Sequence, residues 1–353
     1  MTARGDFRPQ LDVQAASLTS GGLSLHDNGV PLRRAGLGTR RLLSIAMQRE
    51  VAKSGGICLL DEVEHGLEPH RIRHLVRLLR DDSEAETRSQ VLMTTHAPVV
   101  IEELDAQHLR VVRSSNGCTQ VLRVDGALQP IARKAAGAFL ARKILVCEGK
   151  TELGLGRRLD EWWTKEGTSF SYCGVALVDG RGQEAPSIAA SLAGLAYDVA
   201  LFGDSDQPLK PSETELMEAG VEMIRWDGGM ALEERIARDL PWAGVVEMVE
   251  LAMEEYGERG VTDAVTRRLG DAPSNLSGSP EDWLDSGVDV TVLRTAVGKA
   301  AKDHKPANRK GWFKRVDLAE ELGDIVVRHY DRLAATDLGR KILALKAWSQ
   351  PDG

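Results

Sequence analysis

The sequence predicts an α/β fold in which a parallel sheet carries helices on both faces and is followed by a helical appendage. Short, largely apolar runs at residues 144–147, 175–178 and 198–202 alternate with segments of helical periodicity. This alternation is typical of parallel strands joined by helices. Runs that are apolar at nearly every residue, rather than at every second one, indicate strands that are buried on both faces.

The composition is that of a globular chain with room for two domains. The chain has 353 residues, 42% of them hydrophobic, and a formal net charge of −8, so binding to a nucleic acid would need a local basic patch. The four cysteines show no CxxC spacing, which argues against a zinc site and favours reduced thiols. No apolar run has the length of a membrane span, and the N-terminus lacks a signal core. We therefore expect a cytoplasmic protein with no membrane partner.

The first half of the chain carries several motifs in a fixed order. Residues 36–53 begin with Gly36 and Gly38 and continue as a helix, with Arg40 adding charge. A glycine-rich helix start presents N–H groups to an anion, and this segment resembles the signature loop of ABC ATPases. Residues 57–60 are predicted to form a buried strand that ends in Asp61 and Glu62, which resembles a Walker B motif.

Two further motifs complete this resemblance. Residues 64–69 resemble the D-loop of ABC ATPases, and the strand at residues 91–95 leads to His96, which resembles the switch histidine. Residues 1–130 are therefore interpreted as the C-terminal part of an ABC-type ATPase domain, of the kind also found in SMC proteins. The resemblance implies that the ATP-related residues are Gly36, Gly38, Arg40, Asp61, Glu62 and His96.

No phosphate-binding P-loop occurs in the sequence. Gly149-Lys150-Thr151 follows a strand, but position 144 is Ile where the pattern GxxxxGK[ST] requires glycine. We expect either a fragment or truncated gene product, or a first half supplied by another chain. ATP would then act only in the complete protein, and this chain alone is not expected to hydrolyse it. The ATPase region could also mediate a homo-oligomer.

Four acidic residues follow the predicted strands of the second half. The run at residues 144–147 ends in Glu148, and Glu152 lies in the first turn of the next helix; the run at residues 198–202 leads to Asp204 and Asp206. Ligands of open α/β sheets bind at the carboxyl ends of the strands, so we expect these acids to share one site. Carboxylates are the ligands that Mg²⁺ and Mn²⁺ prefer.

Strand-Glu-Gly followed by strand-Asp-x-Asp resembles the Toprim domain. The motif EGKTE resembles the OLD (overcoming lysogenization defect) nucleases, in which Toprim follows an ABC-type ATPase. The resemblance implies a Toprim nuclease domain at residues 143–353, with a helical extension from about residue 240. It also implies a two-metal Mg²⁺ or Mn²⁺ endonuclease that cleaves or nicks DNA, is regulated by the ATPase and serves in phage defence. By the same resemblance Glu233 completes the metal site, with Glu234 as the near-equal alternative.

One segment of this acidic chain is strongly basic. Residues 294–315 contain eight lysines and arginines against the single acid Asp303, and basic side chains bind phosphates whatever the base sequence. Lys310 opens a stretch that resembles the lysine-bearing motif of OLD proteins, and it is assigned to catalysis with Lys314 as the alternative. Trp312 and Phe313 are expected to anchor the segment. The predicted DNA-binding residues are Lys299, Lys302, Lys305, Arg309, Lys314 and Arg315.

Two other functions remain open from the sequence. The first is a RecF-like module that clamps DNA under ATP control without cleaving it. Such chains normally lack acids in the pattern of Glu148, Asp204 and Asp206, which favours the nuclease. The second is a Toprim strand-passage or primase enzyme, which would need a tyrosine or nucleotide-handling domain that the sequence does not display.

Overall fold

The computed structural model describes residues 7–11, 23–27, 29–52, 56–84, 90–115, 117–270, 276, 278–305 and 311–351. The chain divides into two compact units. The first comprises Met1–Arg110 with Arg123–Leu140, and the second comprises Val111–Leu122 with Ala141–Gly353. None of the described helices is both long and apolar enough to cross a membrane. All four cysteines are free thiols.

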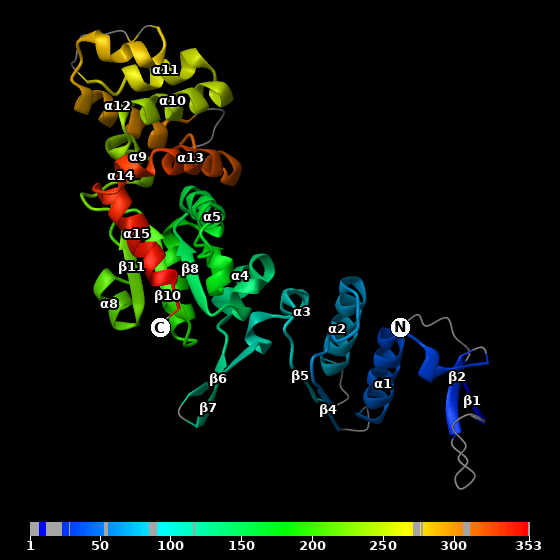
Figure 1. Ribbon diagram of the computed structural model, residues 1–353. Helices are drawn as coiled ribbons and strands as arrows, with labels where there is room; N and C mark the ends of the chain where they lie inside the picture. Colours follow the sequence, from blue (N-terminus) through cyan, green and yellow to red (C-terminus); the bar gives the residue numbers. More distant parts are fainter. Residues whose placement is uncertain are drawn as a thin grey trace. The chain divides into compact units, whose positions relative to one another are not determined.

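The first unit combines short strands with helices (Figure 1). Strands β4 and β5 pair in parallel, with Cys58 opposite Val91, and β1, β2 and β3 form an antiparallel sheet. Its strands and helices are β1 Phe7–Leu11, β2 Leu23–Asp27, β3 Val30–Pro31, α1 Leu37–Ala52, β4 Ile57–Leu60, α2 Pro69–Glu84, β5 Gln90–Met93, α3 Pro98–Glu103 and α4 Gln129–Lys134.

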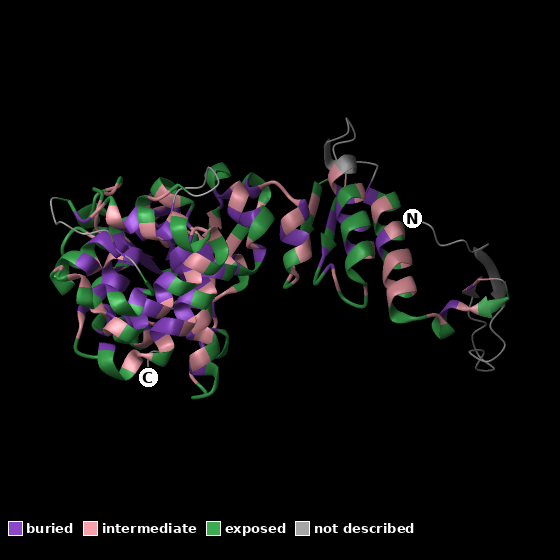
Figure 2. Cartoon of the chain, turned by 90° about the horizontal axis from the view of Figure 1, so that it is seen from above, coloured by how far each residue is buried: buried purple, intermediate pink, exposed green. Residues whose placement is uncertain are grey.

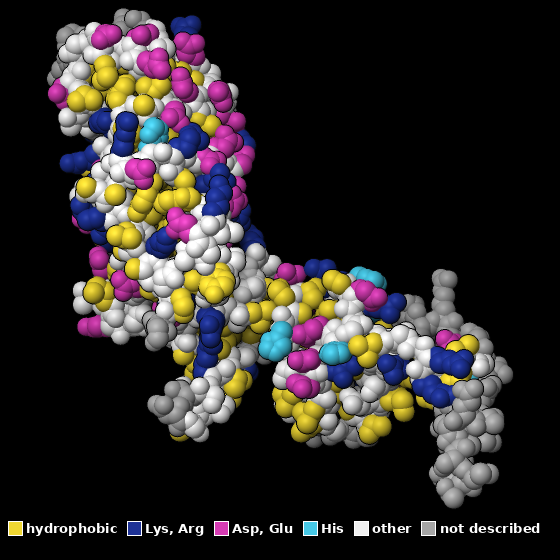
Figure 3. Space-filling view, in the orientation of Figure 1, with side chains coloured by type: hydrophobic (Ala, Val, Ile, Leu, Met, Phe, Trp, Pro, Cys, Tyr) yellow, Lys and Arg dark blue, Asp and Glu magenta, His cyan; other side chains and the backbone are white. Residues whose placement is uncertain are grey.

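The β4–β5 sheet is covered on one face only. Cys58 and Leu60 pack into a core with Ile45 of α1. The alternate residues Ile57 and Leu59 are 62% and 66% exposed, and hydrophobic side chains lie at the surface around β4 in Figure 3. The prediction of a buried strand at residues 57–60 is therefore wrong for one face. Strand side chains alternate between faces, and within the described residues of this unit only one face has a helical layer.

A four-stranded parallel sheet is the centre of the second unit. The strand order is β11-β10-β8-β9, and each neighbouring pair is parallel. The strands are β8 Lys143–Cys147, β9 Val175–Asp179, β10 Asp198–Gly203 and β11 Val221–Arg225. The hairpin of β6 Arg110–Ser115 and β7 Cys118–Arg123 is grouped largely with this unit. The α/β fold with a parallel sheet that the sequence predicted is confirmed.

Helices cover both faces of this sheet because its central strands are apolar on both. Residues 144–147 of β8 are fully buried. Leu145 and Cys147 share a core with Leu159 of α5, whereas Ile144 and Val146 point to the other face, on which α7 packs against β8, β10 and β11. The helices between the strands are α5 Lys150–Thr164, α6 Phe170–Cys173, α7 Ala185–Ala193 and α8 Glu213–Glu218.

Helices make up the rest of the second unit and continue the sheet's core. Figure 2 shows many buried residues through this unit. The buried side chains of its core include Trp226, Trp283 and Trp312. Trp312 and Phe313 are both buried, in agreement with their predicted anchoring role. The helices are α9 Leu232–Asp239, α10 Trp242–Tyr256, α11 Glu258–Thr266, α12 Val290–Asp303, α13 Val316–Arg328, α14 Tyr330–Leu333 and α15 Asp337–Ser349.

Candidate functional site

Two neighbouring strands bring Glu148 and Asp204 together. In the β8–β10 pair Cys147 lies opposite Phe202, so the residues that follow emerge at the same edge of the sheet. The Glu148 backbone N–H donates to the Phe202 carbonyl oxygen at 2.8 Å. The Asp204 backbone N–H donates to Glu148 Oε2, also at 2.8 Å. The Glu148 carboxylate is thus held directly against the backbone of Asp204.

Gly203 makes this contact sterically possible. A Cβ atom on Gly203 would lie 2.5 Å from Glu148 Oε2 and 2.8 Å from Glu148 Cβ. Those separations are too short for any side chain, so a larger residue at position 203 would displace the Glu148 carboxylate. The requirement for glycine therefore comes from the site and not from the backbone conformation of β10.

Glu152 and Glu233 are acids that are almost completely buried. Glu152 is 2% exposed, and its Oε2 accepts a hydrogen bond from the Gly149 N–H at 2.9 Å, across the start of α5. Glu233, in the first turn of α9, is fully buried, and its Oε1 lies 3.1 Å from Thr151 Oγ1. Glu152 Oε1 and Glu233 Oε2 are buried and have no hydrogen-bond partner among the described residues. Buried carboxylate oxygens without partners are costly and indicate a missing cation or donor.

The start of α9 is tied to Asp204. Asp204 Oδ1 accepts a hydrogen bond from the Leu232 N–H at 2.7 Å. Thr151 is fully buried, and its hydroxyl also lies 3.1 Å from the Phe313 carbonyl oxygen. Thr151 therefore links α5, α9 and the segment after residue 310. Sequence reasoning did not single out Thr151, because only the tertiary contacts distinguish it from an ordinary residue in the first turn of a helix.

The pKa values of these acids reflect crowding and burial. Burial is the main cause that raises the pKa of Asp204 to about 9, and the charges of Glu152, Glu233 and Glu148 raise it further. Burial also raises the pKa of Glu152 to about 7, although the Lys314 ammonium opposes this. The pKa of Glu148 is raised chiefly by burial, against the hydrogen bond from Asp204. If all of these acids were ionised, they would therefore carry more negative charge than their protein surroundings can stabilise.

Two lysines of the basic segment lie at these carboxylates. Lys314 Nζ is 2.8 Å from Glu233 Oε1. Burial lowers the pKa of Lys314, but the charges of Glu233 and Glu152 more than offset that effect and leave the pKa well above its usual value. Lys302 Nζ is 2.8 Å from Asp206 Oδ2 and 3.1 Å from Glu234 Oε2. Glu233 and Glu234 are the two alternatives for the additional metal ligand. Glu233 lies near Glu152 and Lys314. Glu234 is instead linked to Asp206 through Lys302.

The other predicted DNA-binding residues differ in their surroundings. Lys299 and Lys305 are exposed. Arg315 pairs with Glu255 and Asp317. Lys310 and Arg309 lie outside the described residues, so their assignments stay predictions.

The carboxylates of this site are of the chemical type that binds a hard divalent cation, but they do not form a complete coordination shell in the structure. Among the described residues, no group of three His, Cys, Asp or Glu side chains lies in an arrangement that could hold a metal ion. Carboxylate oxygens are nevertheless the preferred ligands of Mg²⁺ and Mn²⁺. The two unpartnered oxygens of Glu152 and Glu233 and the raised pKa of Asp204 show where positive charge is lacking. The residue types present therefore suit such an ion in their chemistry, and the ligand assignment stays a prediction.

Two of the predicted ATP-related residues, Asp61 and Glu62, follow β4 in the first unit and are hydrogen-bonded to Thr94, which follows β5. Thr94 Oγ1 donates to Asp61 Oδ1 at 2.6 Å and accepts from the Glu62 N–H at 2.8 Å. The Arg41 guanidinium donates to the carbonyl oxygens of Asp61 and Glu62. Glu62 has a φ of 45°, in the left-handed region that non-glycine residues rarely adopt.

A second set of contacts joins the remaining motifs of this unit. Glu64 Oε1 accepts a hydrogen bond from the His96 N–H at 2.5 Å, which links the predicted D-loop to the predicted switch histidine. Gly38 packs so closely on the Gly66 carbonyl that no side chain would fit there. Gly36 and Arg40 lie on the exposed surface at the start of α1. Whether these residues bind ATP stays a prediction.

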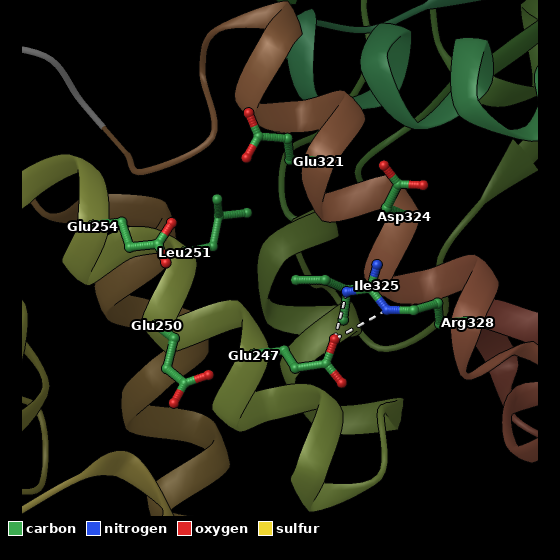
Figure 4. A pocket seen from close by; sticks show the side chains of 8 residues that line it. All are labelled: Glu247, Glu250, Leu251, Glu254, Glu321, Asp324, Ile325 and Arg328. Carbon is green, nitrogen blue, oxygen red and sulfur yellow. Dashed lines mark hydrogen bonds and ion pairs between the residues drawn. The ribbon is translucent and has the colours of Figure 1, made fainter.

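A separate hollow between α10 and α13 is strongly acidic. It has a volume of about 310 Å³. Figure 4 shows its carboxylates around Leu251 and Ile325, with Arg328 paired to Glu247, and acidic side chains are numerous over this region in Figure 3. Like charges repel a phosphate backbone, so this hollow is unsuited to DNA. Its lining residues are Glu247, Glu250, Leu251, Glu254, Glu321, Asp324, Ile325 and Arg328.

Comparison with protein families gives one match, in the first part of the chain. A family model described as an AAA domain, putative AbiEii toxin of a type IV toxin–antitoxin system, matches residues 15–102. This segment is the one that carries the motifs resembling an ABC-type ATPase. No curated protein matches the chain significantly.

Solved structures resemble the chain only at low similarity. The C-terminal region of the Xanthomonas campestris pv. campestris OLD protein is 14% identical, covers 55% of this chain and 99% of its own, and has a TM-score of 0.28. The C-terminal region of the Burkholderia pseudomallei OLD protein is 15% identical, with 53% and 98% coverage and a TM-score of 0.27. An SMC ATPase studied for ATP-driven dimerization and DNA-stimulated activation is 17% identical, with 34% and 75% coverage and a TM-score of 0.26. Because these TM-scores are below 0.5, the function of the second unit has to be inferred from its own residues.

Proposed function

We propose that the second unit is a metal-dependent endonuclease that cleaves or nicks the phosphodiester backbone of DNA. The observation that carries the proposal is the group of buried carboxylates at the carboxyl edge of the parallel sheet. Glu152 and Glu233 each leave a buried oxygen without a partner, and the pKa of Asp204 is raised to about 9. Strained electrostatics of this kind are typical of functional sites.

The carboxylates would hold the cations, and the lysines would act on the phosphate. Glu148, Glu152, Asp204, Asp206 and Glu233 are the proposed ligands of Mg²⁺ or Mn²⁺. Bound divalent ions would supply an activated water and stabilise the leaving oxygen. Glu148 is oriented for this task by the Asp204 N–H at 2.8 Å.

A lysine would stabilise charge that develops on the phosphoryl oxygens. Lys310 is the candidate proposed from sequence, and Lys314 is the candidate whose ammonium lies at the carboxylates, 2.8 Å from Glu233 Oε1. If Lys314 has this role, Lys314→Ala should lower the single-turnover cleavage rate at saturating DNA by about 10²-fold or more, with little loss of DNA affinity. A wild-type cleavage rate for both Lys314→Ala and Lys310→Ala would assign these lysines to DNA binding alone.

The first unit would regulate cleavage through ATP in the complete protein. The family match to an AAA domain supports an ATPase-type role for this unit. DNA would contact the exposed lysines of the basic segment, Lys299 and Lys305, because phosphates are bound by accessible cations.

The proposal is tested by incubating the chain with supercoiled plasmid and Mg²⁺, Mn²⁺ or EDTA. Nicked or linear DNA is expected with either metal and not with EDTA. Asp204→Asn should abolish cleavage, whereas Glu222→Gln, an exposed acid on neighbouring β11, should retain it. DNA binding without cleavage under every metal condition would instead favour the RecF-like clamp.

A further inference from the structure

Lys302 forms a compact ion cluster with two acids from other elements. Its Nζ atom lies 2.8 Å from Asp206 Oδ2 and 3.1 Å from Glu234 Oε2. The three side chains are 23%, 14% and 18% exposed, respectively, so the cluster is largely shielded from water but still open to it. Glu234 Oε2 also accepts a hydrogen bond from the Ala231 N–H at 3.0 Å. Removing Lys302 from this position would leave both carboxylates short of positive charge.

The packing of helix α12 places Lys302 next to Asp206 and Glu234. Gly298 lies one turn before Lys302, and a Cβ atom on it would be 2.8 Å from the Cα atom of Glu234. The glycine therefore allows α12 to approach α9 closely. The end of α12 is fixed as well, because the N–H groups of Gly311 and Trp312 donate to the carbonyl oxygens of His304 and Ala301, both at 2.7 Å.

Lys302 also belongs to a row of lysines that suits a phosphate backbone. Lys299 lies one turn before it on α12, Lys305 lies just beyond the helix end, and both are exposed. Lys302, in the middle of this row, is directed to Asp206 and Glu234 instead of to solvent. A lysine carries its charge on a flexible four-carbon stem, so it can reach either position from the same backbone.

This inference rests on the proposed function. We propose that Lys302 is an exchangeable cation that couples metal binding to DNA binding. When a divalent ion is bound at Asp206, Lys302 keeps only Glu234 as an acidic partner and turns outward to contact a DNA phosphate. Each ligand then strengthens the binding of the other by the same factor, because coupling between two binding equilibria is reciprocal. The chain would hold DNA most tightly when its site is loaded.

The test measures how DNA affinity depends on salt with and without a divalent ion. A fluorescein-labelled DNA duplex is titrated at several NaCl concentrations in EDTA or in Ca²⁺, and a gel checks that the duplex remains intact. In EDTA, Lys302→Met should show the same slope of log affinity against log salt as the wild type. In Ca²⁺ its slope should be shallower than the wild-type slope by about 0.9, the value of one lost phosphate contact. Ca²⁺ also competes with the protein for DNA phosphates. This effect is the same for the variant and the wild type in one buffer, so it drops out of the difference between their slopes.

Lys299→Met is the matched control, because it removes an exposed lysine one turn away on the same helix. It should reduce the slope equally in EDTA and in Ca²⁺. Lys302→Gln, which keeps a hydrogen-bond donor near the two carboxylates, repeats the measurement if Lys302→Met does not fold. Equal slope differences in both buffers for the Lys302 variant, or none in either, would overturn the inference. Cleavage is not the readout, so a chain that cleaves without this coupling loses only the inference, and one that couples without cleaving loses only the proposed nuclease.

Discussion

At the residue scale, Gly203 shows how one missing side chain serves the site. The space where its Cβ would lie is filled by the Glu148 carboxylate, at 2.5 Å from Oε2. Gly203→Ala should therefore destabilise the fold by about 1–3 kcal/mol, the usual cost of overpacking, and should also lower cleavage by displacing Glu148. Urea denaturation and the plasmid assay measure the two effects.

Gly194→Ala is the control for this change. A Cβ atom at position 194 would meet other atoms only at ordinary distances, 3.5 Å and beyond, so its effect on stability should stay within about 0.5 kcal/mol. If Gly203→Ala were as harmless as Gly194→Ala, the Glu148 carboxylate would not need the space that the structure gives it.

Asp204 makes the metal-free protein sensitive to pH. Its pKa is raised from 3.8 to about 9 in the folded state, chiefly by burial. As the pH rises, the unfolded chain loses this proton first, so the stability that the group contributes is complete below pH 3.8 and is lost progressively up to about pH 9. In EDTA, Asp204→Asn should therefore stabilise the protein by about 1 kcal/mol or more at pH 8 and by less at pH 5.

The measurement is urea denaturation of both proteins at the two pH values. Asparagine keeps an oxygen that can accept the Leu232 N–H, now bonded to Asp204 Oδ1 at 2.7 Å, so the local hydrogen bond is preserved. A gain in stability that is the same at pH 5 and pH 8 would show that the carboxylate of Asp204 is not the group that titrates.

At the scale of elements, α9 is held in place by a buried ion network that the sequence does not reveal. Arg235 lies 3.1 Å from Asp239 of the same helix and 3.3 Å from Asp337 at the start of α15. The Leu338 N–H also donates to Asp239 Oδ2 at 2.8 Å. Because α9 carries Glu233 and Glu234, this network positions two acids of the candidate site from its far end.

Arg235→Met should destabilise the fold by about 3 kcal/mol, because it removes the buried cation between Asp239 and Asp337 and, among the described residues, leaves Asp337 with only the Arg340 cation at 3.5 Å. Arg238→Met, an exposed change on the same helix, should cost no more than about 0.5 kcal/mol. Chemical denaturation compares the two variants. Similar small losses for both would mean that α9 is positioned by apolar packing and not by the Arg235 network.

At the scale of the whole molecule, the two units differ in how completely their sheets are covered. The parallel sheet of the second unit has helices on both faces, whereas the β4–β5 sheet of the first exposes Ile57 and Leu59. The first unit contains the residues that resemble the signature, Walker B and switch-histidine motifs. The lysine and N–H groups of a P-loop, which hold the β- and γ-phosphates, do not occur in the sequence.

The polypeptide alone should therefore neither bind nor hydrolyse ATP at a detectable rate, and its cleavage of DNA should be independent of ATP. Phosphate release and plasmid cleavage, each with and without ATP, check this expectation. ATP turnover that Glu62→Gln abolishes would show instead that the first unit completes an ATPase site by another route.

Local sequence patterns were sufficient to predict the α/β fold and to predict that acidic residues follow the ends of two strands. Residues 144–147 and 198–202 are apolar runs, and parallel strands end at one edge, which is why Glu148 and Asp204 could be expected to lie together. Burial of Trp312 and Phe313 also followed from apolar residues within a charged segment. Each of these inferences uses neighbours in the chain, whose spacing is set by the geometry of a strand or a helix.

Only the tertiary structure determined which charged side chains pair with one another. The sequence predicts that Lys302 and Lys314 contact DNA phosphates, whereas in the structure their ammonium groups lie at Asp206 and Glu233. Thr151 gained its place between Glu233 and Phe313 in the same way. These partners lie between 81 residues apart in the chain, for Lys314 and Glu233, and 162 residues apart, for Thr151 and Phe313. Periodicity fixes which face of an element a side chain occupies, but the partner across that face is selected by how the elements pack, because burial makes an unpaired charge too costly to leave alone.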